Sequence, residues 1–343
     1  MSGIKEAIAK VVDGRGLTAD EAASAMETIM SGEATSAQIA SLLTALAMKG
    51  ETVEELTGFA RVMREKCALV SPNVKGHLID TCGTGGAPLK TFNVSTLSAF
   101  VAAGAGIPVA KHGNRAVTSR CGSADVLEAL GANLSLEPAR VQRVIENVGV
   151  GFLFAPNFHP SMKHAAGPRR ELGIRTVFNV LGPLTNPAGA KSQVVGVYHP
   201  ALVSKMTQVL ANLGAERALV VHGEGGLDEV SPLGPTRIGS VIDGKVSFYT
   251  VNPEEFGFKR VTPDDVGGLD KEGSARVFVE VLSAKPGPRL DTVLMNAAAA
   301  AVVGGRASTM KEGIAVARES IESGKALGKL RSFIEATGGK FAG

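Results

Sequence analysis

Apolar residues in the first 70 positions recur at helical spacing. Ile39, Leu42, Leu43 and Leu46 fall on one face of a helix, and the segment from Ile4 to Val11 shows the same spacing. Capping-box pairs precede several of these runs, which is typical of helix N-termini; the pairs are Thr18–Glu21, Thr35–Gln38 and Thr52–Glu55. The pattern predicts a small helical domain over residues 1–72, ending at the linker Ser71-Pro72-Asn73.

From residue 76 onward, short apolar runs alternate with helical stretches. Such alternation predicts a largely parallel sheet covered by helices on both faces, in a larger α/β domain over residues 73–343. The expected strands are 78–79, 108–110, 151–154, 194–197 and 218–221. The expected helices between them are 97–104, 124–130, 138–148 and 201–213.

The end of the chain changes pattern again. Runs 238–242 and 246–251 flank Asp243-Gly244-Lys245, and an Asp-Gly pair between two strands predicts an antiparallel hairpin. The C-terminal part is expected to return to helix over 290–303, 308–323 and 325–337.

The loops at the carboxyl ends of the predicted strands are rich in glycine and polar residues. Ligands of open α/β sheets bind at this edge, so we expect the chemistry in residues 83–96, 111–123, 155–170 and 223–231. The first of these contains Gly83-Thr84-Gly85-Gly86 between a strand and a helix. Glycine backbone and a helix N-terminus together suit a phosphate group, although a tight turn before a buried helix explains the same residues.

Two charged motifs lie in the other loops. Lys111-His112-Gly113-Asn114-Arg115 follows the strand Val109-Ala110, and a lysine there suits a phosphate. Adjacent Asp228 and Glu229 sit in a glycine-rich turn and offer two oxygen ligands for a hard cation. Each motif also reads as a solvated charged turn when it is taken alone.

Composition narrows the class of protein. The net charge of the 343 residues is +3, there is no long basic run, and tryptophan is absent, which argues against nucleic-acid binding. Three cysteines without metal-ligand spacing favour a reduced, cytoplasmic setting. No segment reads as a signal peptide or as a membrane span, so we expect no membrane partner.

Several motifs, in order along the chain, resemble those of anthranilate phosphoribosyltransferases. They are Asp80-Thr81-Cys82-Gly83-Thr84-Gly85-Gly86, Thr91-Phe92-Asn93-Val94-Ser95-Thr96, Lys111-His112-Gly113-Asn114-Arg115, Phe154-Ala155-Pro156, His159-Pro160, Arg169, Glu171-Leu172-Gly173, Arg175-Thr176, Leu181-Gly182-Pro183-Leu184-Thr185-Asn186-Pro187 and Asp228-Glu229-Val230-Ser231. The resemblance runs from the helical start to the C-terminus.

The resemblance implies a fold and a reaction. The fold has a small α-helical domain, with a contribution from about residues 165–185, and a larger α/β domain that binds phosphoribosyl pyrophosphate. The implied protein is a homodimer that contacts its partner through the helical domain. It transfers the phosphoribosyl group to the amine of anthranilate, giving N-(5-phosphoribosyl)anthranilate and pyrophosphate in tryptophan biosynthesis, with Mg²⁺ as cofactor.

The resemblance also implies site residues. Around phosphoribosyl pyrophosphate it places Gly83, Thr84, Gly86, Asn93, Ser95, Thr96, Lys111 and Ser123. Around anthranilate it places Gly83, Asn114, Arg169 and His159. The implied magnesium ligands are Ser95, Asp228 and Glu229, and His112 is the one candidate for a catalytic role. Anthranilate brings its own neutral amine, so positioning and charge stabilisation suffice without a strong base.

One position departs from the family pattern. Ala87 stands where the family commonly has an Asp directly after Gly-Thr-Gly-Gly, and Lys90 follows shortly after. This change puts the number of magnesium ions in question, but not the fold.

Two rival interpretations stay open at this stage. A pyrimidine-type nucleoside phosphorylase shares the implied fold but would use free phosphate and a nucleoside. A non-catalytic member of the family would keep the fold as a binding module, and salt-dependent nucleic-acid binding would reveal it.

Overall fold

The computed structural model describes residues 3–116 and 120–342. The N-terminal part consists of helices, as predicted, and their bounds are α1 (Ile4–Val12), α2 (Ala19–Met30), α3 (Ser36–Lys49) and α4 (Val53–Glu65). All three predicted capping boxes form: the threonine hydroxyl accepts from the third helical N–H, and the Glu or Gln side chain returns to the cap N–H. Local sequence therefore sets where these helices begin.

Within the described residues, seven strands form one sheet in the order β3-β2-β1-β4-β5-β6-β7. The strands β1 to β5 run parallel, whereas β6 and β7 are antiparallel to their neighbours. Their bounds are β1 (Ile79–Gly83), β2 (Val109–Gly113), β3 (Val150–Phe154), β4 (Ser192–Gly196), β5 (Arg217–Gly223), β6 (Thr236–Ile242) and β7 (Lys245–Val251). The fold class and all five predicted parallel strands are confirmed.

The predicted hairpin is also confirmed. Asp243 and Gly244 connect β6 to β7, and both have positive φ angles, 49° and 76°. This backbone matches the right-handed twist of the paired strands and explains the Asp-Gly choice.

Two hydrophobic cores lie on opposite faces of the sheet. Val194 and Leu219 point into the core beneath the C-terminal helices, whereas their chain neighbours Val195 and Val220 point into the core shared with the N-terminal helices. Alternation along each strand thus fills both cores, as expected for a parallel sheet covered on both sides.

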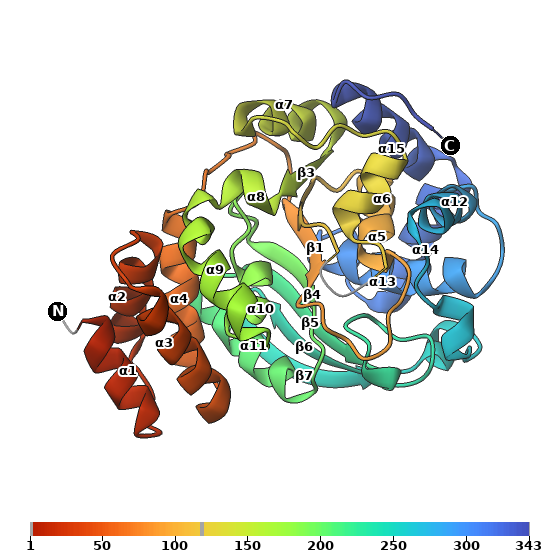
Figure 1. Ribbon diagram of the computed structural model, residues 1–343. Helices are drawn as coiled ribbons and strands as arrows, with labels where there is room; N and C mark the ends of the chain where they lie inside the picture. The colour runs from red at the N-terminus through yellow and green to blue at the C-terminus, as the bar shows by residue number, and fades with distance from the viewer. Residues whose placement is uncertain (1–2, 117–119, 343) are drawn as a thin grey trace.

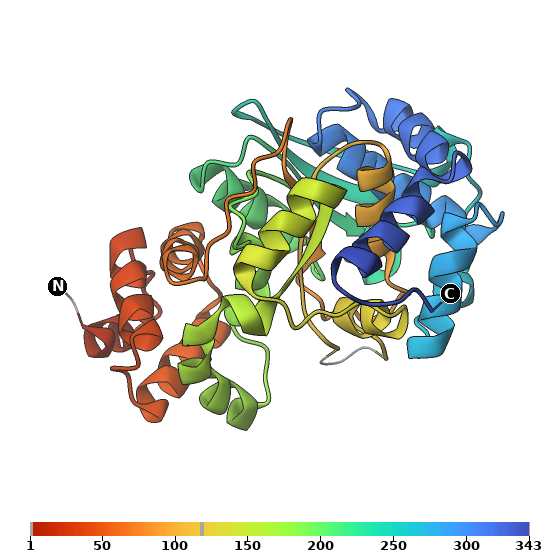
Figure 2. The same cartoon turned by 90° about the horizontal axis from the view of Figure 1, so that it is seen from above.

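Helices α5 and α13 cover one face of the sheet and α11 covers the other (Figure 1). The N-terminal bundle packs on α11 through α4, at the opposite end of the molecule from the C-terminus (Figure 2). The larger domain contains the helices α5 (Val94–Gly104), α6 (Ser123–Ala129), α7 (Pro138–Val148), α8 (Ala155–Phe158), α9 (Lys163–Leu172), α10 (Phe178–Leu181), α11 (Ala201–Asn212), α12 (Lys271–Leu282), α13 (Pro288–Val303), α14 (Met310–Glu322) and α15 (Lys325–Ala336). Short 3₁₀ turns are η1 (Pro160–Met162), η2 (Gly182–Leu184), η3 (Glu224–Gly226), η4 (Pro253–Phe256) and η5 (Pro263–Val266).

Three local expectations were wrong or incomplete. Residues 155–170 are mostly helical, because prolines at the first turns of α8 and η1 start short helices instead of breaking them. Lys111 and His112 do not follow a strand but belong to β2. Helix α12 was not predicted at all, although Asp270 caps it by accepting from the Gly273 N–H at 2.7 Å.

A segment of the larger domain's sequence returns to the helical bundle. Helix α9 packs against α2 and α3, and α10 packs against α4. The core on this side therefore mixes residues from the bundle with Ala165, Phe178 and Leu181.

The structure also bears on the membrane. Among the helices of the described residues, none combines the length and the apolar character that a membrane crossing requires.

Two helical glycines give a matched test of the packing. Gly313 in α14 lies against α13, where an added Cβ would sit 2.6 Å from the Ala298 carbonyl oxygen, whereas Gly328 in α15 faces open space. We expect Gly328→Ala to raise the free energy of unfolding by about 0.5–1 kcal/mol through helix propensity. Gly313→Ala should lower it by about 1–3 kcal/mol because of overpacking. Urea unfolding measures both, and equal effects would show that α13 and α14 do not meet as closely as described.

Candidate active site

The site lies where the strand order reverses. Strand β1 is followed along the chain by β2 on one side, whereas its other neighbour is β4. Between two such strands the outgoing loops diverge and leave a crevice at the carboxyl edge of the sheet. The glycine loop, the first turn of α5 and the segment 227–231 all meet there.

Glycines end three adjacent strands of this edge. An added Cβ at Gly196 would lie 1.6 Å from the Asp228 carbonyl oxygen, and one at Gly223 would lie 2.4 Å from Ser231 Cβ. At Gly83 it would lie 2.8 Å from Asp228 Oδ2. Because the last residues of β1, β4 and β5 are glycines without side chains, the segment 227–231 packs directly on the strand ends.

This packing brings the adjacent acids into a poorly solvated place. Glu229 is 9% exposed, and both of its carboxylate oxygens lie 3.1 Å from the Thr91 hydroxyl. Asp228 Oδ2 accepts from the Gly85 N–H at 3.1 Å. Burial raises the pKa of Asp228, and burial followed by the Asp228 charge raises the pKa of Glu229 well above its usual range.

A small cavity of about 20 Å³ borders both acids and the side chain of Ser95. That volume holds about one water molecule or one ion. Its other walls come from β1, α5, β4, β5 and α13, through Thr81, Cys82, Ser98, Val194, Gly196, Val221 and Asn296.

The donor set around this cavity suits Mg²⁺. Two carboxylates and a hydroxyl are hard oxygen ligands, and Mg²⁺ is usually held by one or two carboxylates together with substrate phosphates and waters. The part of the chain that the structure describes contains no cluster of three or more His, Cys, Asp or Glu side chains able to hold a metal alone. A cation here would therefore depend on ligands from a bound phosphate.

Lys111 brings a positive charge beneath the same place. Its Nζ donates to the Thr81 carbonyl oxygen at 2.5 Å and lies 3.4 Å from Ser95 Oγ. The side chain is buried, and burial lowers the pKa of Lys111. Its position within β2 excludes the solvated basic turn.

The glycine loop is held by bonds to neighbouring strand ends. The Thr84 N–H donates to the Gly196 carbonyl at 2.9 Å, and the Thr84 hydroxyl accepts from the Tyr198 N–H at 3.2 Å. Gly85 and Gly86 have φ angles of 65° and 80°, which side-chain-bearing residues rarely adopt. Ala87 is buried, at 4% exposure, so the residue that departs from the family pattern faces protein.

The first turn of α5 supplies further donors. Ser95 and Thr96 lie in this turn, where backbone N–H groups have no acceptor inside the helix. Asn93 caps the helix, and its Nδ2 donates to the Cys121 carbonyl at 3.1 Å. Its Oδ1 is buried without a hydrogen-bond partner among the described residues, which leaves an acceptor for a ligand hydroxyl.

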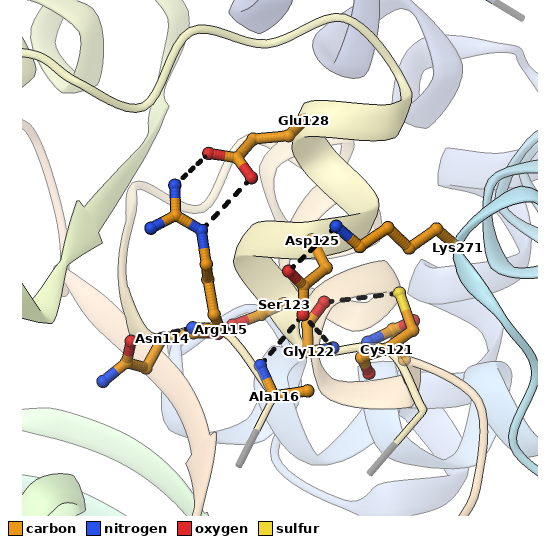
Figure 3. Close-up of polar contacts among 10 residues, drawn as sticks. Asn114, Arg115, Ala116, Cys121, Gly122, Ser123, Asp125, Glu128 and Lys271 are labelled. Atoms are coloured by element: carbon orange, nitrogen blue, oxygen red, sulfur yellow. Dashed lines mark hydrogen bonds and ion pairs between the residues drawn. The ribbon is translucent and has the colours of Figure 1, made fainter.

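Described residues between β2 and α6 are held by the first turn of α6 (Figure 3), and residues 117–119 of the predicted loop 111–123 lie outside the described residues. Asp125 Oδ2 accepts from the N–H groups of Ala116 and Gly122, each at 2.9 Å, and Lys271 lies 3.5 Å from Oδ1. The Ser123 hydroxyl donates to the Asn114 carbonyl at 3.1 Å. These bonds bring two predicted ligand residues, Ser123 and Asn114, together.

Arg115 points away from this pair. Its guanidinium binds Glu128, with Nη2 2.7 Å from Oε1 (Figure 3). It also stacks on Phe154, with Cζ 4.7 Å from the ring centre. Arg115 therefore ties the end of β2 to α6, and its charge is already neutralised by Glu128.

His112 and His159 form a buried pair. Their Nε2 atoms are 3.2 Å apart, so one proton lies between them. Burial and the charge of His159 lower the pKa of His112 to about 3, and burial lowers the pKa of His159 to about 4.

Arg169 lies in the last turn of α9, with Cζ 4.9 Å from the centre of the Phe178 ring. The side chain is half-buried, and no ion pair of Arg169 occurs among residues 3–116 and 120–342. Its neighbour Arg170 is exposed, and Arg175 binds the glycine loop instead. Of the three arginines considered, Arg169 thus combines a half-buried position with a charge that has no acidic partner in the described chain, whereas Arg170 is exposed and Arg175 is bound to the Gly86 carbonyl.

The sequence alone did not reveal several residues that hold the site. Buried Asp80 accepts from the His112 N–H at 3.1 Å and from Asn186 Nδ2 at 2.7 Å, and Asn186 also donates to the Ala110 carbonyl. Asn296 fixes Val230 through bonds of 2.8 and 2.9 Å. Asn296 is the one polar residue in the apolar run 293–303 of α13, and that signal could have been noticed.

The predicted residues therefore separate into neighbouring groups. Ser95, Asp228 and Glu229 border the small cavity, and Lys111 lies beside Ser95. A second group joins His112 to His159, and a third joins Asn114 to Ser123. Gly83 lies beside Asp228, whereas Arg169 lies in α9 against Phe178.

Comparison with known proteins identifies the family. A model described as "Glycosyl transferase family, a/b domain" matches residues 75–327, and one described as "Glycosyl transferase family, helical bundle domain" matches residues 5–67. An anthranilate phosphoribosyltransferase of Pelotomaculum thermopropionicum is 55% identical over 340 residues, which cover 98% of this chain and 97% of the relative.

Solved structures give the same result. The anthranilate phosphoribosyltransferase of Thermus thermophilus is 44% identical, with a TM-score of 0.91 over 96% of this chain and 99% of its own. The Saccharomyces cerevisiae enzyme in complex with PRPP (phosphoribosyl pyrophosphate) and Mg is 31% identical, with a TM-score of 0.89 over 98% of each chain. A second structure of the yeast enzyme contains 4-fluoroanthranilate.

Identity over nearly the whole length, the two family matches and the shared fold lead to one conclusion: this chain belongs to the anthranilate phosphoribosyltransferase family.

Proposed function

We propose that this chain is the enzyme that transfers the phosphoribosyl group of phosphoribosyl pyrophosphate to the amine of anthranilate in tryptophan biosynthesis. The observation that carries the proposal is the buried pair Asp228–Glu229, seated on strand-end glycines against Ser95 at the switch point of the sheet. Relatives at this level of identity carry the same activity in their names.

The donor would lie across the glycine loop and the first turn of α5. We assign Gly83, Thr84, Gly86, Asn93, Ser95, Thr96, Lys111 and Ser123 to it. Backbone N–H groups and the partial positive charge of a helix N-terminus favour the phosphates. The unpaired Oδ1 of Asn93 can accept from a ribose hydroxyl.

Asp228, Glu229 and Ser95 would hold Mg²⁺, which neutralises the pyrophosphate as it leaves. The pKa values of the two acids are raised mainly by burial, with the Asp228 charge adding to the shift of Glu229, and a bound cation would offset this cost of burying the charged forms. With Ala87 buried in place of the family's usual Asp, these three residues form the magnesium site that we propose.

The acceptor would lie between the β2 end and α9. We assign Gly83, Asn114, Arg169 and His159 to anthranilate, with Arg169 facing its carboxylate. His112 and His159 are neutral near pH 7, so the pair can accept a hydrogen bond from the amine or take its proton. The anthranilate analogue in the yeast enzyme supports an acceptor of this class.

An activity assay tests the proposal. Anthranilate fluorescence should fall only when anthranilate, phosphoribosyl pyrophosphate and Mg²⁺ are all present. Phosphate-dependent cleavage of thymidine or uridine, without loss of anthranilate, would instead identify a nucleoside phosphorylase.

We further propose the domain division at residues 72 and 73, with α9 and α10 joining the helical domain, and a cytoplasmic location. All three cysteines, Cys67, Cys82 and Cys121, lack disulfide bonds, which supports a reducing compartment.

The magnesium role of the acids gives a first prediction. Asp228→Asn together with Glu229→Gln should abolish turnover, because the cation loses both charged ligands. The free energy of unfolding without ligands should stay equal or rise at pH 7, since two crowded buried charges are removed. Asp264→Asn, an exposed acid elsewhere, serves as the control. A large loss of ligand-free stability would mean that the pair is structural.

Arg169→Ala should weaken the binding of anthranilate much more than the binding of phosphoribosyl pyrophosphate. Loss of a charge-assisted contact costs about 1.5–3 kcal/mol, or roughly ten- to a hundredfold in the KM for anthranilate. Arg170→Ala, the exposed neighbour, should change neither KM. Equal effects on both substrates would remove Arg169 from the acceptor site.

The histidine pair predicts acid sensitivity. Each folded pKa lies below the usual 6.5, so its contribution to stability is fully present above pH 6.5 and is lost as pH falls toward about 4 and about 3. When the pH falls from 7.5 to 5.5, each histidine should lower the free energy of unfolding by about 1 kcal/mol. Urea unfolding at both pH values should show a smaller drop for His159→Asn than for the parent chain. An unchanged drop would mean that His159 titrates normally.

We also propose a homodimer formed through the helical domain. Met48, Val12 and Ile174 are exposed apolar side chains on or beside it, at 84%, 66% and 50%. Light scattering at micromolar concentration should give twice the chain mass of 35.2 kDa. A single chain mass, or a dimer unaffected by Met48→Glu, would contradict this interface.

A further inference from the structure

Arg175 makes a contact that the proposed function does not use. It lies in the link between α9 and α10, and its Nη2 donates to the Gly86 carbonyl oxygen at 2.5 Å. Its guanidinium also stacks on Tyr198, with Cζ 4.4 Å from the ring centre. The link between α9 and α10 thus contacts the glycine loop directly.

The contact requires a glycine at position 86. Gly86 has a φ angle of 80°, and an added Cβ would lie 3.1 Å from Arg175 Cζ and 3.2 Å from Nη2. Both the backbone conformation and the closeness of the arginine therefore exclude a larger residue.

The contact also fixes the orientation of the next backbone N–H group, that of Ala87. In a trans peptide the C=O and N–H groups point in opposite directions. With the Gly86 carbonyl turned toward Arg175, the Ala87 N–H points the other way. Without this bond the 86–87 peptide could rotate and present an oxygen, which repels phosphate, in place of an N–H.

Other bonds hold the earlier part of the loop to the sheet. Thr84 is tied to Gly196 and to the Tyr198 N–H, and Gly85 is tied to Asp228. Arg175 connects the glycine loop to the helical bundle instead. It follows α9, and α9 packs on α2 and α3. Tyr198 takes part in both sets, through its N–H and through its ring.

We propose that Arg175 is a positioning residue for the donor: it locks the 86–87 peptide of the glycine loop and couples that loop to the α9–α10 segment, which carries Arg169. This inference rests on the proposed function, since it specifies how the donor loop is set. Donor binding then depends on where the acceptor-side segment lies, so the two substrates influence each other's affinity through Arg175.

A direct acceptor role for Arg175 fits the contacts less well. Its guanidinium is occupied by the Gly86 carbonyl and the Tyr198 ring, whereas Arg169 has no carboxylate partner among the described residues. Loss of an acceptor contact would raise the KM for anthranilate, and loss of a loop lock would raise the KM for the donor.

Steady-state kinetics on three variants tests the inference. Arg175→Met removes the bond and the charge, and Arg175→Lys keeps the charge but loses the planar fork. Arg170→Met removes the same charge from the same segment at an exposed position and is the matched control. Melting temperatures without ligands check that each variant is folded.

We expect Arg175→Met to raise the KM for phosphoribosyl pyrophosphate about tenfold or more, as for a lost charge-assisted hydrogen bond. Arg175→Lys should lie between Arg175→Met and the parent chain, and Arg170→Met should match the parent chain. The KM for anthranilate at saturating donor should change much less. Calorimetry with phosphoribosyl pyrophosphate and Mg²⁺ should show the same order of donor affinities.

The inference is overturned if Arg175→Met leaves donor KM and donor affinity unchanged in an active enzyme. It is also overturned if Arg170→Met has the same effect, because overall charge would then explain both. A parent chain that neither turns over nor binds the donor would overturn the proposed function and this inference with it.

Discussion

The absence of side chains at the ends of β1, β4 and β5 is the constraint on which the site depends. Because Gly196 has no Cβ, the backbone of Asp228 can lie against the strand end, and Gly83 and Gly223 make room beside it. The segment 227–231 thereby closes over the switch point of the sheet. The cavity beside Ser95 and the bond from Thr91 to Glu229 depend on this packing of the segment 227–231.

The charges around the segment 227–231 are buried without a bound cation or phosphate, and this suits the proposed reaction. Two adjacent acids lose hydration, and Lys111 is buried nearby against Thr81 and Ser95. Charges held so closely are costly by themselves but become favourable when a cation and a polyphosphate complete the set. The neutral histidine pair follows directly along β2, since His112 is the chain neighbour of Lys111. In the function that we propose, the acids and Lys111 serve the phosphoribosyl donor, whereas the histidine pair and Arg169 serve anthranilate.

Local signals allowed much of the fold to be predicted from the sequence. Thr18, Thr35 and Thr52 marked helix starts through their own capping bonds, and Asp243-Gly244 marked the hairpin through its backbone preference. Helix α12 was missed because Gly273 and its valines disfavour a helix locally, and packing against α6, α13 and α15 overrides that preference. Pro156, Pro160 and Pro168 likewise hid the helical character of residues 155–170.

The site was predicted as a set of motifs but not as an arrangement. The family resemblance named Ser95, Lys111, Asp228 and Glu229 individually, whereas their meeting depends on strand order, which no local pattern encodes. The bonds of Asp80 with Asn186 and of Gly86 with Arg175 join residues 106 and 89 positions apart. Lys111 was expected in a ligand-binding loop directly after a strand because the short apolar run ended before it, yet β2 continues to Gly113. A buried charge of this kind breaks the usual strand pattern, and such breaks concentrate at functional sites.

One measurement tests the central claim, that the segment 227–231 at the switch point holds the cation between its two acids and the bound phosphoribosyl pyrophosphate. Crystals grown with phosphoribosyl pyrophosphate and Mn²⁺ in place of Mg²⁺ would locate the metal by its anomalous scattering. The account predicts a manganese peak within bonding distance of Asp228 or Glu229 and of a pyrophosphate oxygen, beside Ser95. A donor bound with its metal elsewhere, and with both acids making only protein contacts, would contradict it.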